Sequence, residues 1–520
     1  MNGMGFSLSK SVQSQLIIVF VLYSLIVIAL SLYVKKSSQS ANANQKLKNF
    51  LTGGDSLGPI AIGMLLFTGM SSAGSAVGGP GTGYSQGFIW SVAVWSGFAF
   101  GGMIPLIIGK KMAIIAKRIG AVSIISMLKH RYGGSKIYAI LLSVCFIAFL
   151  GAQIVGQFSG GGRIFAVVSG DGNYQIGVLI IAAVTVIYTM TGGIKSIGKV
   201  AVVQGFIMIS TVIIMYIAVM NRVGIEYGSL TEFSNWIAKN NAALVAADNW
   251  KPMYTFGTAI LMCAINIALP SGLISGFTYN NSNKLMKTVV IATICTIIYQ
   301  FIMSGLGPFA FGLNQNLTSG DYTTVFLATE VLPGFMAGVV VAGITSAIQS
   351  TIATLMIILT GSLVVDVYKN IFNPNAEDEK LTKMNKIVTI SFGLICTLIA
   401  LHPTNMIQIF INFASGGLAS ALFFPILFGF YSKRATTAGA IGSTVAGVIV
   451  YAFSYCFSTF ETTKAWWNLY MGNVYPVVPA MIVALIVMLI CNKIFRPVEL
   501  GRLQVWFCED YKEEWADINK

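Results

Sequence analysis

Long apolar segments separated by short polar ones dominate the pattern of hydrophobic and polar positions along the chain. A helix needs about 20 apolar residues to cross the roughly 30 Å of hydrocarbon in a bilayer. About 13 segments approach that length, and none shows the period-two alternation of a membrane-spanning strand. The pattern predicts an all-α, polytopic membrane protein. The segments lie at 14–34, 57–80, 87–109, 137–168, 174–191, 200–220, 254–276, 287–312, 334–364, 387–402, 405–430, 436–458 and 474–492.

Composition supports this fold class. Of 520 residues, 55% are hydrophobic and 10% are charged, whereas soluble domains have about 45–50% apolar and about 25% charged residues. These values exclude an ordinary soluble protein and a disordered chain. The loops are short, so no separate soluble domain is expected.

Basic residues set the expected orientation. Lys and Arg number 32 against 18 Asp and Glu, a net charge of +14. With the N-terminus outside, most of the basic residues fall on the inner side, as the positive-inside rule requires. The charge is therefore a topology signal and not a nucleic-acid site. We expect a multi-pass plasma-membrane protein with a cytoplasmic C-terminus, and a basic amphipathic helix at 110–136 lying on the bilayer.

Groups that carry catalysis are scarce inside the spans. Almost every Asp and Glu lies outside the apolar segments, and HExxH and Walker A motifs are absent. No CxxC motif or Cys/His cluster suggests a metal site. The sequence therefore argues against an enzyme and against an ATP-driven pump within this chain, and it indicates no cofactor.

Two apolar segments contain residues that interrupt helices. Segment 64–83 reads MLLFTGMSSAGSAVGGPGTG, and 266–276 reads NIALPSGLISG. An interior Gly costs a helix about 1 kcal/mol and a Pro about 3 kcal/mol. Carbonyl oxygens freed at a break need partners inside the membrane, and a dehydrated cation is one. Two such breaks are typical of inverted-repeat transporters with a midplane site; tight packing through small residues is the alternative.

A later span carries hydroxyl groups on one face. In 342–354, AGITSAIQSTIAT, the residues Ala347, Ser350 and Thr351 have the spacing i, i+3, i+4 and share a helix face. Uncharged oxygens suit a hard monovalent cation that must bind reversibly. Alternatively, the hydroxyls bond to the backbone of their own helix.

Several stretches, in order along the chain, resemble the sodium/solute symporter family, most closely its sodium/pantothenate branch. They are FLTGGDSLGP at 50–59, GGPGTGYSQG at 78–87, GAQIVGQFSGGGRIF at 151–165, YTMTGGIKS at 188–196, Gln204-Gly205, and AIQSTIATLMIILTGSLVVDVYKN at 347–370. The resemblance implies a 13-helix, five-plus-five inverted-repeat (LeuT-like) fold.

The implied organisation has four parts. An extra helix and a cytoplasmic loop occupy 1–56. The transport core spans 57–430, with repeats at 57–220 and 254–430. Two C-terminal helices follow at 431–492, and a cytoplasmic tail occupies 493–520.

The resemblance also implies a sodium site and a solute site. Sodium would be held by backbone carbonyls at the first break and by the small and hydroxyl face of the later helix: Thr68, Ser71, Ala347, Ser350 and Thr351. The solute would lie between the two breaks, with candidate ligands Ser72, Gly74, Ser75, Gln153, Gln157, Asn266 and Ser271. For Gln153 and Gln157 the alternative role is interhelical hydrogen bonding.

Two further positions leave alternatives open. Ala201 stands where the family often has an Asp linked to sodium passage, and Lys199 lies close by. Lys199 could replace the cation, which would give proton-coupled or sodium-independent transport, or it is one more inside-facing charge. Arg163 either lies near the outer interface or faces the cavity, where it could attract a substrate carboxylate.

We therefore expect a secondary active transporter and not an enzyme. Inward sodium flow would drive uptake of a small organic solute, pantothenate or a similar carboxylate, by alternating access. A proton-coupled or sodium-independent carrier is the nearest alternative. The expected partners are the solute, the coupling ion Na+ and the lipid bilayer, without nucleic acid; the sequence indicates no oligomeric state.

Overall fold

The fold is given by a computed structural model that describes residues 4–37, 50–51, 57–101, 104–170, 172–245, 252–273, 282–402 and 407–507. These residues are almost entirely helical and include no β-strand. The helices are α1 Lys10–Ser37, α3 Pro59–Met70, η3 Gly74–Gly78, α4 Gly79–Gln86, α5 Phe88–Gly101, α6 Ile104–Ile119, α7 Ile124–Arg131, α8 Lys136–Ser169, α9 Tyr174–Tyr227, α10 Leu230–Asn240, η4 Ala242–Leu244, α11 Pro252–Ala268, α12 Pro270–Leu273, α13 Ser282–Leu313, η7 Gly320–Tyr322, α14 Thr323–Val331, α15 Gly334–Gly361, η8 Ser362–Phe372, α16 Asp378–Ala400, α17 Ile407–Tyr431, α18 Thr437–Thr459, α19 Glu461–Tyr470, α20 Val477–Ile494 and α21 Leu500–Phe507.

The predicted apolar segments all contain helices. Within the described residues, nine helices are long and apolar enough to cross a membrane, and α3 with η3–α4 forms a further span bent by 60°. Three shorter apolar helices, 88–97, 174–190 and 252–268, match the remaining predicted segments. The all-α, polytopic prediction is confirmed.

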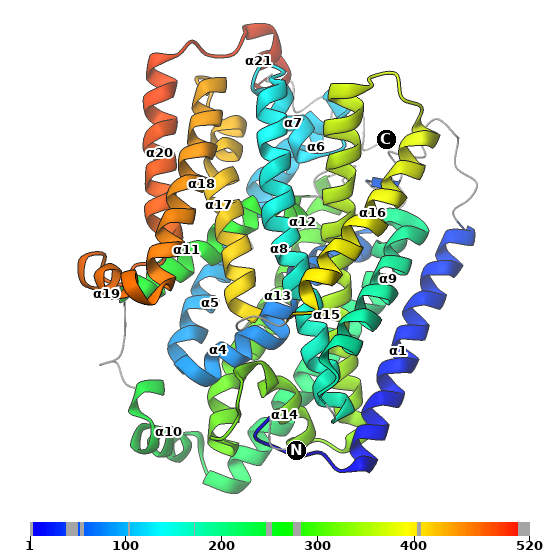
Figure 1. Ribbon diagram of the computed structural model, residues 1–520, viewed down its shortest axis with the longest axis vertical. Helices are drawn as coiled ribbons and strands as arrows, with labels where there is room; N and C mark the ends of the chain where they lie inside the picture. Colours follow the sequence, from blue (N-terminus) through cyan, green and yellow to red (C-terminus); the bar gives the residue numbers. More distant parts are fainter. Residues whose placement is uncertain are drawn as a thin grey trace.

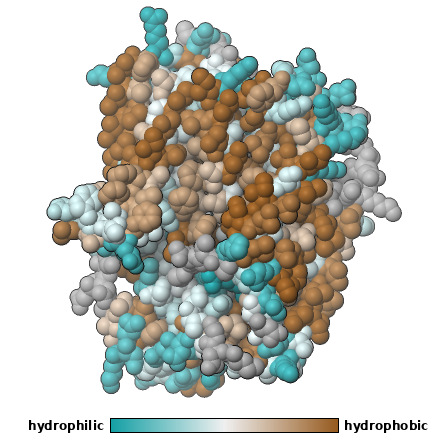
Figure 2. Space-filling model, in the orientation of Figure 1, coloured by the Kyte–Doolittle hydropathy of each residue, from teal (hydrophilic) through white to brown (hydrophobic). Residues whose placement is uncertain are grey.

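The bundle has a protein-packed centre and a lipid-facing periphery. The most apolar window of α15 is 89% buried inside the protein, whereas that of α20 is 28% buried. Figure 1 shows α1 and α20 at opposite edges of the molecule, with α8, α15 and α17 between them. Figure 2 shows apolar side chains over the middle and upper part of this face, with polar ones gathered at its two ends. Buried α15 therefore lies where a site can be shielded from lipid.

The second break also matches its prediction. Helix α11 ends at Ala268, and the short helix α12 begins at Pro270. Pro270 has no N–H to continue the hydrogen-bond ladder of α11. Residues 274–276 of the predicted interruption lie outside the described residues.

The basic stretch 110–136 differs from its prediction as one helix on the bilayer surface. It forms the end of α6 and then α7, which packs against α8, α17 and η8. Arg131 is 1% exposed. Its guanidinium donates to the carbonyl oxygens of Gly429 at 2.8 Å and Ser432 at 2.6 Å, where α17 ends. The free carbonyls of a helix C-terminus attract a cation. The Arg131 guanidinium is therefore buried at the end of α17 and does not face the bilayer surface.

Helix α9 is divided by a backbone irregularity at Gly193, which has φ of 62° and ψ of −162°. Residues other than Gly rarely adopt this conformation. A Cβ atom at this position would also lie 2.4 Å from the carbonyl oxygen of Phe50. Gly193 therefore allows the chain before α3 to pack against α9.

Replacing Gly193 with Ala should destabilise the protein by about 1–3 kcal/mol, because the left-handed backbone becomes strained and the backbone of Phe50 must move. Thermal unfolding in detergent would show a lower midpoint. Gly224→Ala is the matched control: it lies in the same helix and has no atom within 4 Å of its added Cβ. Equal midpoints for the two variants would contradict this account of Gly193.

Candidate functional site

The first break exposes the backbone between Met70 and Gly74, and side chains satisfy its N–H groups. The N–H of Ser72 donates to Ser75 Oγ at 2.9 Å, and that of Gly74 donates to Ser72 Oγ at 3.1 Å. The N–H of Ala73 donates to Oε1 of Gln157 at 2.6 Å. The break is thus a defined structure held by short hydroxyl side chains and by α8.

Carbonyl oxygens at the end of α3 face the hydroxyl groups of α15. Ser350 Oγ lies 3.0 Å and Thr351 Oγ1 lies 3.2 Å from the carbonyl oxygen of Thr68. Thr351 Oγ1 also donates to the carbonyl oxygen of Ser71 at 2.8 Å. The carbonyl oxygen of Ala347 lies 3.1 Å from Ser350 Oγ. The structure therefore brings together all five residues that the sequence assigned to sodium.

This cluster consists of neutral oxygens. Among the described residues, no group of three or more His, Cys, Asp or Glu residues could hold a metal ion. The Ser350 hydroxyl also lies 2.8 Å from the carbonyl oxygen of Ser346, in its own helix. It can donate there and direct its lone pairs toward the break. The cluster can therefore present carbonyl and hydroxyl oxygens to a hard monovalent cation, which is typically bound by such ligands.

A cavity adjoins this cluster and lies between the two breaks. Ser72, Gly74, Ser75 and Gln153, four of the predicted solute ligands, line it. Thr351 lines it too, so one side chain contacts both the oxygen cluster and the cavity. We call this space the central cavity.

The central cavity has polar lining residues that the sequence reasoning missed. They are Trp90, Gln300, Ser304, Gln408, Asn412 and Ser415. The only available signal was an amide or hydroxyl within a long apolar run, such as Gln408 and Asn412 one turn apart in 405–430. No titratable side chain lines the cavity in the described part of the chain.

Several polar atoms on the cavity wall have no hydrogen-bond partner within the described residues. They are Oε1 of Gln153, Oε1 of Gln408, Oγ of Ser415 and Nε1 of Trp90. Nε2 of Gln408 donates to Oδ1 of Asn412 at 2.6 Å. Buried polar groups are normally satisfied. This wall therefore has donors and acceptors available for a polar, uncharged part of a ligand.

Three predicted solute ligands lie outside the lining of the central cavity. Gln157 uses its carbonyl oxygen to hold the break. Asn266 donates to the carbonyl oxygen of Met262 in its own helix at 2.7 Å. Ser271 lies in α12, beyond the second break, and is buried. These three residues do not line the central cavity, and their assignment as solute ligands stays a prediction.

Two charged residues also have defined places. Lys199 is exposed and does not line the central cavity, so its ammonium does not replace a cation there. Arg163 pairs through Nε with Oδ2 of buried Asp321 at 3.0 Å. Burial raises the pKa of the Asp321 carboxyl, and Arg163 acts in the opposite direction. Arg163 thus ties α8 to η7 and does not line the cavity.

The loop that contains Asp321 covers one end of the cavity region. Thr324 donates to the carbonyl oxygen of Ala76 at 2.8 Å. Gly81 and Gly320 approach so closely that a Cβ atom on Gly81 would lie 2.6 Å from the Gly320 backbone. The loop therefore closes over η3 and α4, at the end of the molecule where Figure 1 shows α14 and the N-terminus.

Comparison with known proteins gives relatives over nearly the whole chain. The sodium/pantothenate symporter of Escherichia coli K12 is 28% identical over 494 residues, which cover 92% of this chain and 97% of that protein. The sodium/pantothenate symporter of Haemophilus influenzae is 28% identical over 92% of this chain and 96% of its own. A sodium/proline symporter of Staphylococcus aureus is 24% identical over 95% of this chain and 96% of its own.

Solved structures share the fold. A substrate-bound, outward-open Na+-coupled sialic acid symporter matches with a TM-score of 0.71 at 17% identity, over 93% of this chain and 99% of that one. A nucleobase-cation-symport-1 family transporter matches with a TM-score of 0.55 at 15% identity, over 91% and 99% of the two chains. The predicted LeuT-like fold is thereby confirmed. The model of the sodium:solute symporter family matches residues 50–447, so this chain belongs to that family, as a sodium-coupled transporter and not an enzyme.

Proposed function

We propose that this membrane protein uses sodium to drive uptake of pantothenate or a closely similar hydroxylated carboxylate. The observation that carries the proposal is the meeting of Ser350 and Thr351 with the free carbonyls of Thr68 and Ser71. In a chain of this family, these oxygens form the proposed sodium site. Ala347 supplies a further carbonyl oxygen beside them.

The central cavity fits the chemistry of pantothenate, which carries hydroxyl groups, an amide, a methyl-bearing carbon and a carboxylate. The amides of Gln153, Gln300 and Gln408 can bind the hydroxyls and the amide. Apolar residues such as Leu261 and Ile411 line the same space and can contact the methyl groups. The sodium/pantothenate symporters named above support this choice of solute over other carboxylates.

The carboxylate supplies a physical basis for coupling. No cationic side chain lines the described part of the cavity, and an uncompensated buried charge is costly. A sodium ion beside Thr351 would lie at the cavity wall and attract the solute carboxylate, so each would increase the affinity for the other. Their joint preference for one conformation would then shift the equilibrium between the outward-open and inward-open states.

The proposed topology has the N-terminus outside and the C-terminal region in the cytoplasm. Figure 1 shows the N-terminus at the end opposite to α6, α7 and α21. The α6–α7 end carries Lys110, Lys111, Lys117, Arg118 and Lys129, and such basic clusters favour the inner side. The loop that closes over α4 is then extracellular. The division into 1–56, 57–430, 431–492 and 493–520 stays a prediction.

Thr351→Ala should raise the sodium concentration for half-maximal pantothenate uptake about tenfold or more, because it removes one oxygen near the ion, worth roughly 1.5–3 kcal/mol. Uptake into proteoliposomes at varied external sodium measures this change. Thr351→Ser keeps the hydroxyl and should retain the sodium dependence. Thr345→Ala is the control, because the Thr345 hydroxyl bonds to Val341 of its own helix. Unchanged sodium dependence in Thr351→Ala would show that the sodium site is misassigned.

Gln153→Ala should raise the pantothenate concentration for half-maximal uptake about 5-fold to 100-fold at saturating sodium, the equivalent of roughly 1–3 kcal/mol for a lost hydrogen bond. Gln157→Ala offers a contrast one turn away: it frees the Ala73 N–H at the break, so its main effect should be on stability and sodium dependence. If Gln157→Ala weakened pantothenate binding at saturating sodium as much as Gln153→Ala, the proposed solute site would be wrong.

A further inference from the structure

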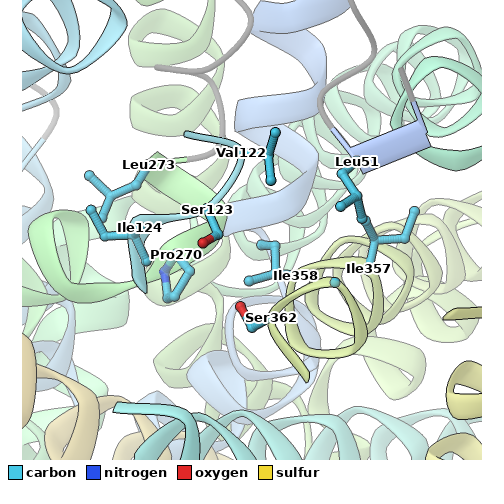
Figure 3. Close-up of a pocket in the computed structure, with 10 residues that line it drawn as sticks. Leu51, Val122, Ser123, Ile124, Pro270, Leu273, Ile357, Ile358 and Ser362 are labelled. Atoms are coloured by element: carbon cyan, nitrogen blue, oxygen red, sulfur yellow. The ribbon is translucent and has the colours of Figure 1, made fainter. Parts of the chain in front are cut away.

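A second cavity lies at the α7 end of α15. We call it the α7 cavity. Its wall comes from the start of α7, from α12, from Leu51 and from the end of α15 (Figure 3). The wall is apolar except for two hydroxyl groups, those of Ser123 and Ser362. These two hydroxyls therefore decide which polar species the cavity can accept.

A buried carboxylate stands behind the two hydroxyls. Asp366 is 0% exposed. Ser123 Oγ lies 2.8 Å from its Oδ1 and 2.6 Å from its Oδ2. The Ser362 hydroxyl is buried beside the same carboxylate without a hydrogen bond of regular geometry. A buried carboxylate behind an apolar wall favours a nearby cation, because an uncompensated buried charge is costly.

The charge of Asp366 is only partly compensated by nearby cationic side chains. Among the described residues, no Lys or Arg lies within ion-pair distance of its carboxylate. Lys129 acts on it electrostatically but directs its ammonium to the carbonyl oxygen of Asn370 at 3.4 Å. The carboxylate therefore has no directly paired cation among the described residues, and the nearby lysine would keep cation binding weak.

The carboxylate lies farther along the same continuous stretch of helix as the proposed sodium site. Ser350, Thr354, Ile358, Ser362 and Asp366 follow one another at intervals of four residues along α15 and η8. Successive members of this series are neighbours about one turn apart, and the series winds around the helix along its length. Ile358 and Ser362 line the α7 cavity. The α7 cavity therefore lies beside the part of this helix that follows the proposed sodium site.

We propose that Asp366, Ser123 and Ser362 form a second, weaker site for the coupling ion on its way to the cytoplasm, an inference that rests on the function proposed above. The ion takes the place of the Ser123 proton at the carboxylate. The Ser123 hydroxyl then turns its oxygen to the ion, as Ser350 does at the first site. The carboxylate replaces part of the ion's hydration shell until the ion reaches water in the cytoplasm.

The test compares two assays in right-side-out vesicles. Net pantothenate uptake into a sodium-free lumen requires sodium release in every cycle. Pantothenate counterflow with saturating sodium on both sides does not. Asp366→Asn should lower net uptake about tenfold and leave counterflow and the external sodium dependence within about twofold. Asp378→Asn is the control, because Asp378 is an acid near the same end that pairs with Lys369 at 3.3 Å.

Each outcome is decisive for the inference. A proportional fall of net uptake and counterflow would assign Asp366 a structural role as the partner of Ser123 and overturn the proposal, as would no fall in either. If Asp366→Asn does not fold, Ser123→Ala and Asp366→Glu must show the same selective loss of net uptake, or the proposal fails. If the wild type shows no sodium-dependent uptake, the proposed function itself is wrong, whatever the variants do.

Discussion

The structure depends on one constraint: a stretch of unwound backbone in the apolar centre needs partners for its backbone N–H and C=O groups. Between Met70 and Gly74 the N–H groups are satisfied by Ser72, Ser75 and Gln157. Hydroxyls of α15 donate to the carbonyl oxygens of Ser71 and, just before the break, Thr68, and Ser75 donates to that of Ser72. Because no water is available in hydrocarbon, this break exists only where other helices surround it. The break in α3 therefore needs a deeply buried helix beside it, and α15 is that helix.

The same constraint places the proposed ion and solute sites beside each other. Thr351 contacts the free carbonyls on one side and the central cavity on the other. Local order at the break therefore affects both sites. An interaction between them needs no long pathway, because a shared side chain and a shared backbone segment connect them. In the proposed function, this direct connection couples a sodium site of neutral oxygens to transport of a charged solute.

The sequence was sufficient to predict the features that break a regular pattern. Gly, Ser and Pro in 64–83 identified the first break, and Pro270 identified the second. The spacing of Ala347, Ser350 and Thr351 identified the face that meets the first break. These signals are local, because helix interruption and helical periodicity are properties of neighbouring residues.

The orientation of polar residues on uninterrupted helices could not be predicted in the same way. Gln153 and Gln157 are one turn apart on α8, yet one faces the central cavity and the other holds the break. Helix α8 buries residues on several sides, so its apolar pattern does not mark a single inward face. Gln408 and Asn412 were missed for the same reason. Only the packing of α17 against its neighbours brings them to the cavity.

The hydrogen bonds of Ser350 and Thr351 with the first break affect the step in which the empty transporter reorients. A symporter must reorient while empty, and an empty break would leave bare carbonyl oxygens in a dry interior. Here the two hydroxyls cap those oxygens themselves. The unloaded carrier can thus stay compact and reset, while entry of an ion requires only that two hydroxyl protons rotate aside.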